Sequence, residues 1–296
     1  MSTESPVPRT QIAPADFVAL AAIATIWGVN NLLAKLAVDA IPPLMTAGLR
    51  FAIVLVVLAP FLKPPKAGWG ALLRVALLTG PLHFALQYSG LALAHDLSPM
   101  VIAMQLWIPA SVGFAAAWLG ERAGAWRLAG VGAAFAGVAA MALDPVVFQQ
   151  IGALALVAVA AASYGAGAVL VRQAPALHPL TFQAWIAALS CPVLLALSAT
   201  FEHGQVAAIQ TAPWTIWASI AFAAVGSSVL ASAMMFQLVQ KYEVSRTTPF
   251  LFLSPLVGVG LGVAVLGDPL TWQFFLGAAL TLVGVAMVAL AERRGR

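Results

Sequence analysis

Hydrophobic residues gather in ten long runs along the chain, and short segments with Pro, Gly or charged residues separate them. A helix needs about 20 mainly apolar residues to cross the hydrocarbon core of a bilayer, and each run has roughly that length. The runs lack the strict polar–apolar alternation of membrane barrel strands. We therefore predict ten membrane-spanning helices. They are expected at residues 16–38, 43–62, 70–94, 98–118, 125–143, 151–172, 180–200, 213–238, 247–266 and 271–291.

The composition agrees with this prediction. Hydrophobic residues make up 62% of the 296 positions and charged residues only 8%, whereas soluble domains are about half apolar and about a quarter charged. We expect an all-α integral membrane protein whose solvent is the lipid bilayer. The net charge of +4 does not indicate a nucleic-acid partner, because the basic residues are spread among loops instead of forming one face. Residues 1–15 lack the apolar core and cleavage site of a secretory signal.

The basic residues predict how the helices are oriented. Lys and Arg collect in cytoplasmic segments of membrane proteins. If the N-terminus is inside, all but Lys35 and Arg50 of the 14 basic residues fall on inner segments. We therefore expect a multi-pass protein of the bacterial inner membrane with both termini in the cytoplasm.

Two halves of the chain resemble each other. Residues 118–143 align without gaps on residues 265–290. Several glycines and one acidic residue fall at equivalent positions in the two segments. The matched pairs are Gly120/Gly267, Glu121/Asp268, Gly130/Gly277 and Gly137/Gly284, and earlier in each half Gly28/Gly165, Lys35/Arg172 and Pro42/Pro179. The halves are residues 16–144 and 151–291, with five helices each. An odd number of crossings inverts the second half, which predicts an inverted repeat with a solute site near the midplane. The alternative is that glycine-rich membrane helices resemble one another because small residues help them pack.

The motif W-G-x-N-x-x-x-x-K at residues 27–35, with Leu-Gly-Glu and Leu-Gly-Asp before the last helix of each half, resembles the drug/metabolite transporter superfamily. The match is to its EamA-type exporters and covers nearly the whole chain. Within that family the chain looks like bacterial aromatic amino acid exporters of the YddG type. This resemblance implies secondary transport of aromatic and other bulky neutral amino acids.

The sequence offers no candidate for catalysis or for a cofactor. It lacks the G-x-x-x-x-G-K-[ST] loop that binds nucleotide phosphates and any His, Cys and carboxylate cluster with metal spacing. No nucleophile, base and orienting acid can be assembled from the spans. We expect neither an enzyme nor a bound metal.

Polar residues within spans are costly in lipid and are therefore candidates for function. Trp27, Asn30 and Asn31 share one face of the first helix, and His83 and Gln87 lie one turn apart on the third. We expect these residues to line a solute cavity. The other candidate binding residues are Met104, Trp107, Tyr164, Trp185, Ser228 and Ser232. The alternatives are interhelical hydrogen bonding for the amides, core packing for Met104 and Trp107, and proton transfer for His83.

No Asp or Glu lies deep within a predicted span. The lining suits a neutral or zwitterionic solute, with amides for its polar head and Trp, Met and Tyr for its body. Arg50, some eight residues into the second helix, is expected to fix that helix, with direct solute contact as the alternative.

The repeat also places four charged residues at equivalent helix ends on opposite membrane faces. Lys35 and Asp268 fall on the outer side, and Arg172 and Glu121 on the inner side. We hypothesise that Lys35–Asp268 and Arg172–Glu121 form alternately as the two sides close. For Glu121 the alternative is that it caps the fifth helix and pairs with Arg122.

Taken together, the residues and the resemblance favour an alternating-access exporter of aromatic and other bulky neutral amino acids. The alternatives are export of another small organic solute or drug-like amphiphile, and a membrane receptor or scaffold without transport. The sequence carries no signature of transport direction, energy coupling or oligomeric state.

Overall fold

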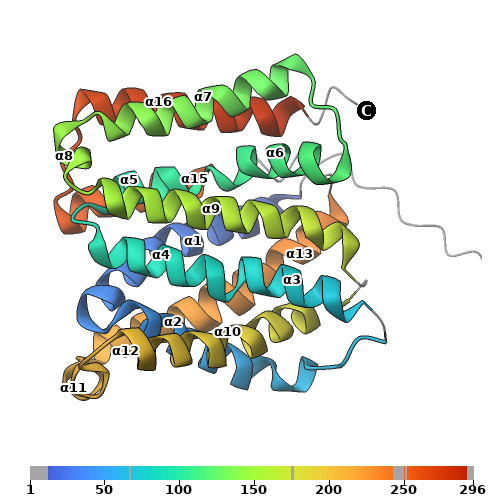
Figure 1. Ribbon diagram of the computed structural model, residues 1–296, viewed down its shortest axis with the longest axis vertical. Coiled ribbons are helices and arrows are strands. Elements are labelled where there is room, and N and C mark those ends of the chain that lie inside the picture. The colour runs from blue at the N-terminus through green and yellow to red at the C-terminus, as the bar shows by residue number, and fades with distance from the viewer. Residues whose placement is uncertain (1–12, 67, 175–176, 243–249, 251, 292–296) are drawn as a thin grey trace, which may run out of the picture.

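The computed structural model describes residues 13–66, 68–174, 177–242, 250 and 252–291, and every regular element in these residues is a helix (Figure 1). The first half contains α1 (Pro14–Ala40), α2 (Pro43–Leu58) with η1 (Ala59–Phe61), α3 (Trp69–Thr79), α4 (Pro81–Leu93), α5 (Leu97–Met104), α6 (Trp107–Leu119) and α7 (Ala125–Ala142). The short α8 (Pro145–Phe148) connects the halves. The second half contains α9 (Ile151–Leu170) with η2 (Val171–Gln173), α10 (Pro179–Phe201), α11 (Gln205–Thr211), α12 (Trp214–Ala221), η3 (Phe222–Ala231), α13 (Ser232–Lys241), α15 (Leu253–Leu261), η4 (Gly262–Leu266) and α16 (Trp272–Ala291).

These helices confirm the predicted membrane fold. In the described part of the chain, nine helical segments are long and apolar enough to cross a membrane. Each coincides with a predicted span to within a few residues. The remaining span, predicted at 247–266, is described as a shorter apolar helix over Leu253–Leu266, because its first residues lie outside the described ones.

Two predicted spans are interrupted near their middle. The third span breaks between α3 and α4 at Gly80, whose φ of −104° and ψ of −105° are not helical. The fourth span breaks between α5 and α6 at Gln105–Leu106. A proline follows each break, and proline cannot donate the backbone hydrogen bond that would continue the helix. Pro81 starts α4, and Pro109 leaves the Gln105 carbonyl without its usual partner four residues on.

The last helices of the two halves, α7 and α16, lie side by side (Figure 1). A Cβ atom on Gly130 would lie 2.8 Å from the Gly284 carbonyl oxygen, and one on Gly277 would lie 2.6 Å from the Gly137 carbonyl oxygen. Residue numbers rise along α7 as they fall along α16, so the two helices are antiparallel. Equivalent helices of the two halves therefore run in opposite directions, as an inverted repeat requires.

A second pair of aligned glycines makes equivalent contacts in the two halves. Gly28 of α1 packs against α15, and its added Cβ would lie 2.8 Å from the Ser254 carbonyl oxygen. Gly165 of α9 packs against α6, and its added Cβ would lie 2.6 Å from the Trp107 carbonyl oxygen. The first helix of each half thus contacts the fourth span of the other half. This exchange of helices between the halves encloses the centre of the molecule.

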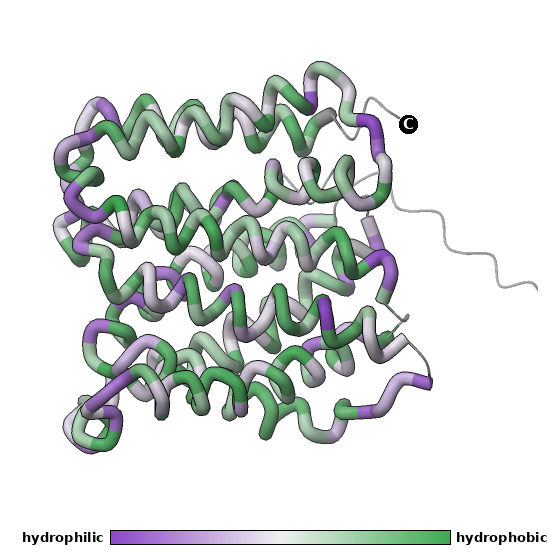
Figure 2. Tube along the Cα trace, in the orientation of Figure 1, coloured by the Kyte–Doolittle hydropathy of each residue, from purple (hydrophilic) through white to green (hydrophobic). Residues whose placement is uncertain are grey.

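Polar segments gather at two opposite edges of the helix bundle, and apolar segments lie between them (Figure 2). The loop at 62–66 and the loop at 120–124 lie at the same edge, on the right of Figure 1. Large apolar side chains point outward between the edges, and Phe135 and Val283, near the middle of α7 and α16, are 45% and 54% exposed. Such exposure is costly in water and is expected in lipid.

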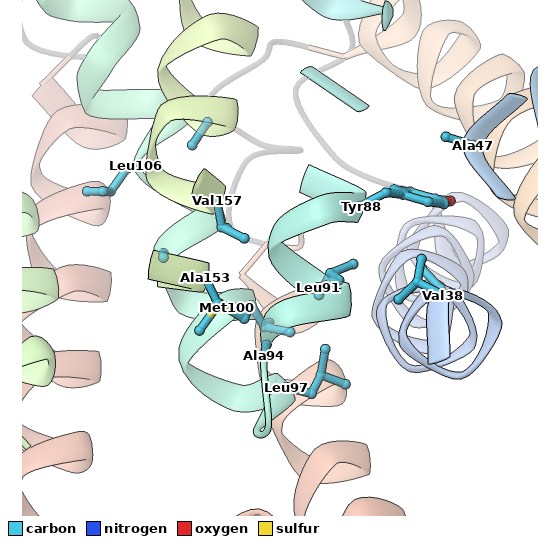
Figure 3. Packing of buried hydrophobic residues seen from close by; sticks show 14 of the residues in the cluster. Val38, Ala47, Tyr88, Leu91, Ala94, Leu97, Met100, Leu106, Ala153 and Val157 are labelled. Carbon is cyan, nitrogen blue, oxygen red and sulfur yellow. The ribbon is translucent and has the colours of Figure 1, made fainter. Parts of the chain in front are cut away.

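The interior is packed with apolar side chains from both halves. Figure 3 shows Tyr88 of α4 extending toward the helices that carry Val38 and Ala47, while Val157 of α9 lies on the other side of α4. Tyr88 and Met100 are almost fully buried. This packing holds α4 between α1, α2 and α9, so that its polar residues face a defined space.

Candidate functional site

Two adjoining cavities lie within the bundle, with volumes of about 410 and 430 Å³. Four residues line both of them: Trp27, Arg50, Phe84 and Tyr164. They come from α1, α2, α4 and α9, so both halves contribute to the shared wall. The cavities therefore meet at a boundary between the two halves.

The first cavity brings together most of the residues expected to bind a solute. Trp27, Asn30 and Asn31 come from α1, and His83 and Gln87 from α4. The remaining predicted residues in its wall are Met104, Trp107 and Tyr164. The one-turn spacings on α1 and α4 place each polar set on the face that looks inward.

The second cavity extends toward the ends of α9 and α10 that are predicted to be cytoplasmic. The predicted residues Ser228 and Ser232 line it. Its other residues are Thr79, Ala168, Val171, Phe182, Gln183, Ile186 and Ser227. Ser228 lies in the π-helical segment η3, where its hydroxyl donates to the Ala223 carbonyl at 3.2 Å. Such segments are frequent at functional sites because they alter the direction of side chains within a helix.

Trp185 does not line either cavity, contrary to the expectation for this residue. Its indole nitrogen donates to the Lys63 carbonyl at 2.9 Å, and its ring lies edge-on to Trp69 with centroids 4.8 Å apart. The residues of α10 that line the second cavity are Phe182, Gln183 and Ile186. Positions two apart point to nearly opposite sides of an α-helix, so Trp185 must point away from it.

Aromatic rings follow one another along the cavity wall. Trp107 lies edge-on to Tyr164 with centroids 5.5 Å apart, and Tyr164 is 5.1 Å from His83. His83 lies edge-on to Phe84 at 4.8 Å. These separations are typical of favourable aromatic pairs. The rings give the cavity a rigid apolar surface.

His83 is buried and makes a specific hydrogen bond. Its Nδ1 lies 2.8 Å from the Ala160 carbonyl oxygen. Because a carbonyl only accepts, Nδ1 carries the proton. This bond ties α4 to α9 and fixes the orientation of the ring. With its ring held in this way, His83 forms part of the wall of the first cavity.

The amide of Asn30 has an unused acceptor. Its Oδ1 is buried, and no described residue donates to it. Buried polar atoms are nearly always hydrogen-bonded, so such an atom requires an explanation. A solute with an N–H group in the first cavity would provide a donor.

The first cavity is also lined by residues that were not among the expected binding residues: Arg50, Phe84, Val101, Gln105, Met235, Ser254 and Pro255. Gln105 had a signal in the sequence, since it is polar within an apolar span and precedes Pro109 by four residues. Phe84 had none, because one more phenylalanine in an apolar run looks like any residue of the core. Arg50 was expected to fix its helix, and it does bond to α4 and η3. Its Nη1 donates to the Tyr88 hydroxyl at 2.9 Å, and its Nε and Nη2 donate to Ser228 Oγ at 3.2 and 2.9 Å.

Of the two proposed gating pairs, one is present in this structure. Arg172 and Glu121 form an ion pair at the predicted inner edge. Lys35 instead lies 2.5 Å from Asp39 on its own helix. Asp268 accepts from the backbone N–H and hydroxyl of Ser98, at 2.6 and 2.5 Å, at the start of α5. The outer pair is thus not formed in this conformation, and the alternation remains a prediction.

The predicted outer edge carries a group of polar side chains around Asp268. Gln150 accepts from the backbone N–H groups of His95 and Asp96 and donates to the Asp96 carboxylate at 2.7 Å. Burial, and next the negative charge of Asp268, raises the pKa of the Asp96 carboxyl. In the described residues, no group of three or more His, Cys, Asp or Glu side chains could hold a metal ion.

Known proteins with a similar sequence are membrane transporters. The EamA-like transporter family matches residues 14–143 and again residues 151–290. A probable amino-acid metabolite efflux pump of Escherichia coli (strain K12) is 28% identical over 279 residues, which cover 89% of this chain and 91% of that protein. The uncharacterized transporter YvbV of Bacillus subtilis (strain 168) is 30% identical over 295 residues, covering 95% and 92%. A solved crystal structure shares the fold, with a TM-score of 0.64 at 17% identity over 96% of this chain and 100% of its own.

Proposed function

The chain belongs to the EamA-like transporter family, which matches both of its halves, and on that premise we propose that it exports aromatic and other bulky neutral amino acids by alternating access. Family membership makes it a membrane transporter and not an enzyme. The name of the Escherichia coli relative supports amino acids as the solute class. The preference for aromatic side chains rests on the cavity of this chain.

The wall of the first cavity is the observation that supports this choice of solute. It combines the amides of Asn30, Asn31 and Gln87 with the rings of Trp107 and Tyr164. Among the described residues that line the two cavities there is no Asp or Glu. A cationic solute would lose its hydration there without gaining an anionic partner. A zwitterion with an apolar body fits this wall better.

The position of the cavities supports alternating access. They lie where the two inverted halves meet, the usual place of the site in transporters built from such repeats. We propose that the protein lies in the bacterial inner membrane with both termini in the cytoplasm, as the distribution of Lys and Arg predicts. The second cavity would then extend toward the cytoplasm.

Counterflow in liposomes tests the proposal. Purified protein is reconstituted into vesicles loaded with unlabelled phenylalanine, with equal pH on both sides, and entry of labelled solute is measured. We expect labelled phenylalanine and tryptophan to enter faster than glutamate or lysine. Entry without a pH gradient would show that proton coupling is not required for exchange.

Other outcomes of the same assay would support the alternatives. Exchange of an organic acid or a drug-like amphiphile, with no exchange of any amino acid, would contradict the proposed solute class. Absence of flux for every solute, from protein that is folded and inserted, would support a receptor or scaffold.

A further inference from the structure

Arg50 is a buried cation in the wall shared by the two cavities. Its side chain comes from α2, is 5% exposed, and lines both cavities. A charged side chain at membrane depth is costly and usually marks a pathway or a binding site. The structure therefore has to account for the position of this charge.

The partners of Arg50 among the described residues are all neutral. They are the hydroxyls of Tyr88 and Ser228 and the ring of Phe84, whose centroid lies 4.8 Å from Cζ. The ion pairs of the described residues join Lys35 to Asp39, Arg172 to Glu121 and Lys241 to Asp16, and none includes Arg50. A buried cation without an anion is strongly disfavoured, so an anionic partner from outside the chain would stabilise it.

Among the described residues, the guanidinium also lacks acceptors for some of its donors. It has five N–H groups, of which Nε, Nη1 and Nη2 each donate one to Tyr88 or Ser228. One N–H on each terminal nitrogen remains. Two N–H groups on a planar fork match the two oxygens of a carboxylate. Phe84 packs near the group and leaves its edges available for hydrogen bonding.

We propose that Arg50 binds the carboxylate of the transported solute. This inference rests on the proposed function and identifies the residue that recognises the acid group common to all amino acids. Trp27 and Tyr164 line both cavities with Arg50 and would contact the apolar body. The unused Oδ1 of Asn30 would accept from the ammonium group. The site then offers a donor and an acceptor to the two ends of a zwitterion.

A purely structural role explains less of what is seen. Linking α2 to Tyr88 and Ser228 requires only neutral donors, which a glutamine could supply without placing a charge at this depth. A residue that only links helices would also not need to line both cavities, as Arg50 does. An anionic ligand accounts for both the positive charge and the two N–H groups that no described residue accepts from.

Ligand pairs that differ only in the acid group test the proposal directly. Thermal stabilisation of the purified full-length protein in detergent is titrated with phenylalanine and phenylalaninamide, and with 3-phenylpropionate and 3-phenylpropionamide. We expect each acid to bind roughly ten- to a hundredfold more tightly than its amide, as for hydrogen bonds to a charged group. In Arg50→Gln this ratio should fall to about one.

Matched variants separate charge recognition from general damage. Arg74→Gln removes an exposed arginine of α3 that bonds only to the Gly70 carbonyl among the described residues, and it should keep the wild-type ratio. Ser228→Ala removes a partner of Arg50 but keeps the cation, so the acid should remain preferred. Arg50→Lys keeps the charge but lacks the fork, so the ratio should decrease without disappearing.

A folded Arg50→Gln protein that still prefers the acids overturns the proposal. If that variant does not fold, an unchanged ratio in Arg50→Lys overturns it. The proposed function is judged separately by counterflow of phenylalanine with wild-type protein. Exchange of phenylalanine together with a ratio insensitive to Arg50 refutes only the role of Arg50. Absence of amino acid exchange together with an Arg50-dependent preference for 3-phenylpropionate refutes only the solute class.

Discussion

Trp107 and Trp185 are both tryptophans in spans, yet the structure gives them different surroundings. Trp107 faces the first cavity and lies edge-on to Tyr164. Trp185 faces the loop after η1, where it bonds to the Lys63 carbonyl. At the scale of the residue, function depends on the direction of the side chain more than on its type. The pair therefore offers a test with a matched control.

We expect Trp107→Ala to weaken apparent affinity for phenylalanine about tenfold, because an aromatic contact contributes about 0.5–1.5 kcal/mol beyond the burial of its area. Trp185→Ala should leave the affinity close to that of the wild type. The concentration of phenylalanine that gives half-maximal counterflow measures both effects. Equal losses in the two variants would contradict the assignment of Trp107 to the solute cavity.

At the scale of the element, glycines decide how closely helices approach. On α7, Gly130 faces α16, whereas Gly132 has nothing within 4 Å of where its Cβ would be. A Cβ on Gly130 would also lie 2.9 Å from Cβ of Met287. The neighbouring atoms belong to the backbone or lie close to it, so they have little freedom to move away.

Gly130→Ala should therefore destabilise the protein by about 1–3 kcal/mol, the usual cost of overpacking. Gly132→Ala adds the same methyl group to an open face of the same helix, and alanine is the better helix former. It should be neutral or slightly stabilising. Thermal unfolding in detergent compares the two variants. A similar decrease in melting temperature for both would show that α7 and α16 separate more easily than this packing implies.

At the scale of the whole molecule, the repeat relates the two membrane faces. The Arg172–Glu121 pair joins η2 to the loop after α6 at the predicted inner edge. Glu121 pairs here with Arg172, 51 positions away, rather than with its neighbour Arg122. Both side chains are partly exposed, so the pair contributes only about 0–1 kcal/mol. A difference of that size is enough to shift the balance between two conformations.

Exchanging the two charges tests this role. Glu121→Arg and Arg172→Glu should each lower counterflow by up to about fivefold, the factor that corresponds to a weak ion pair. The double variant should recover most of the flux. As a control, Glu121→Arg combined with Arg122→Glu should not recover it. A double exchange of Glu121 and Arg172 that is no better than the single variants would contradict the gating hypothesis.

The sequence by itself determined the membrane class, the approximate position of every described span and the correspondence between the two halves as a repeat. Long apolar runs have few ways to satisfy their backbone groups in lipid other than as helices. The aligned glycines Gly130, Gly137, Gly277 and Gly284 already indicated the repeat, and only the structure shows that they form the contact between α7 and α16. The one-turn spacing of Asn30, Asn31 and Trp27 identified an inward face because helical geometry fixes which side chains share a side.

Only the tertiary structure decided which polar residues meet. Periodicity assigns a residue to a face of its own helix, but it does not say which helix lies opposite. Arg50 contacts both Tyr88 and Ser228, and Ser228 lies 178 positions further along the chain. These contacts depend on the packing of α2 against α4 and η3. The outward direction of Trp185 is decided in the same way, because neighbouring helices determine which face of α10 looks inward. The solute cavity is therefore a property of helix contacts, whereas the spans are a property of the chain alone.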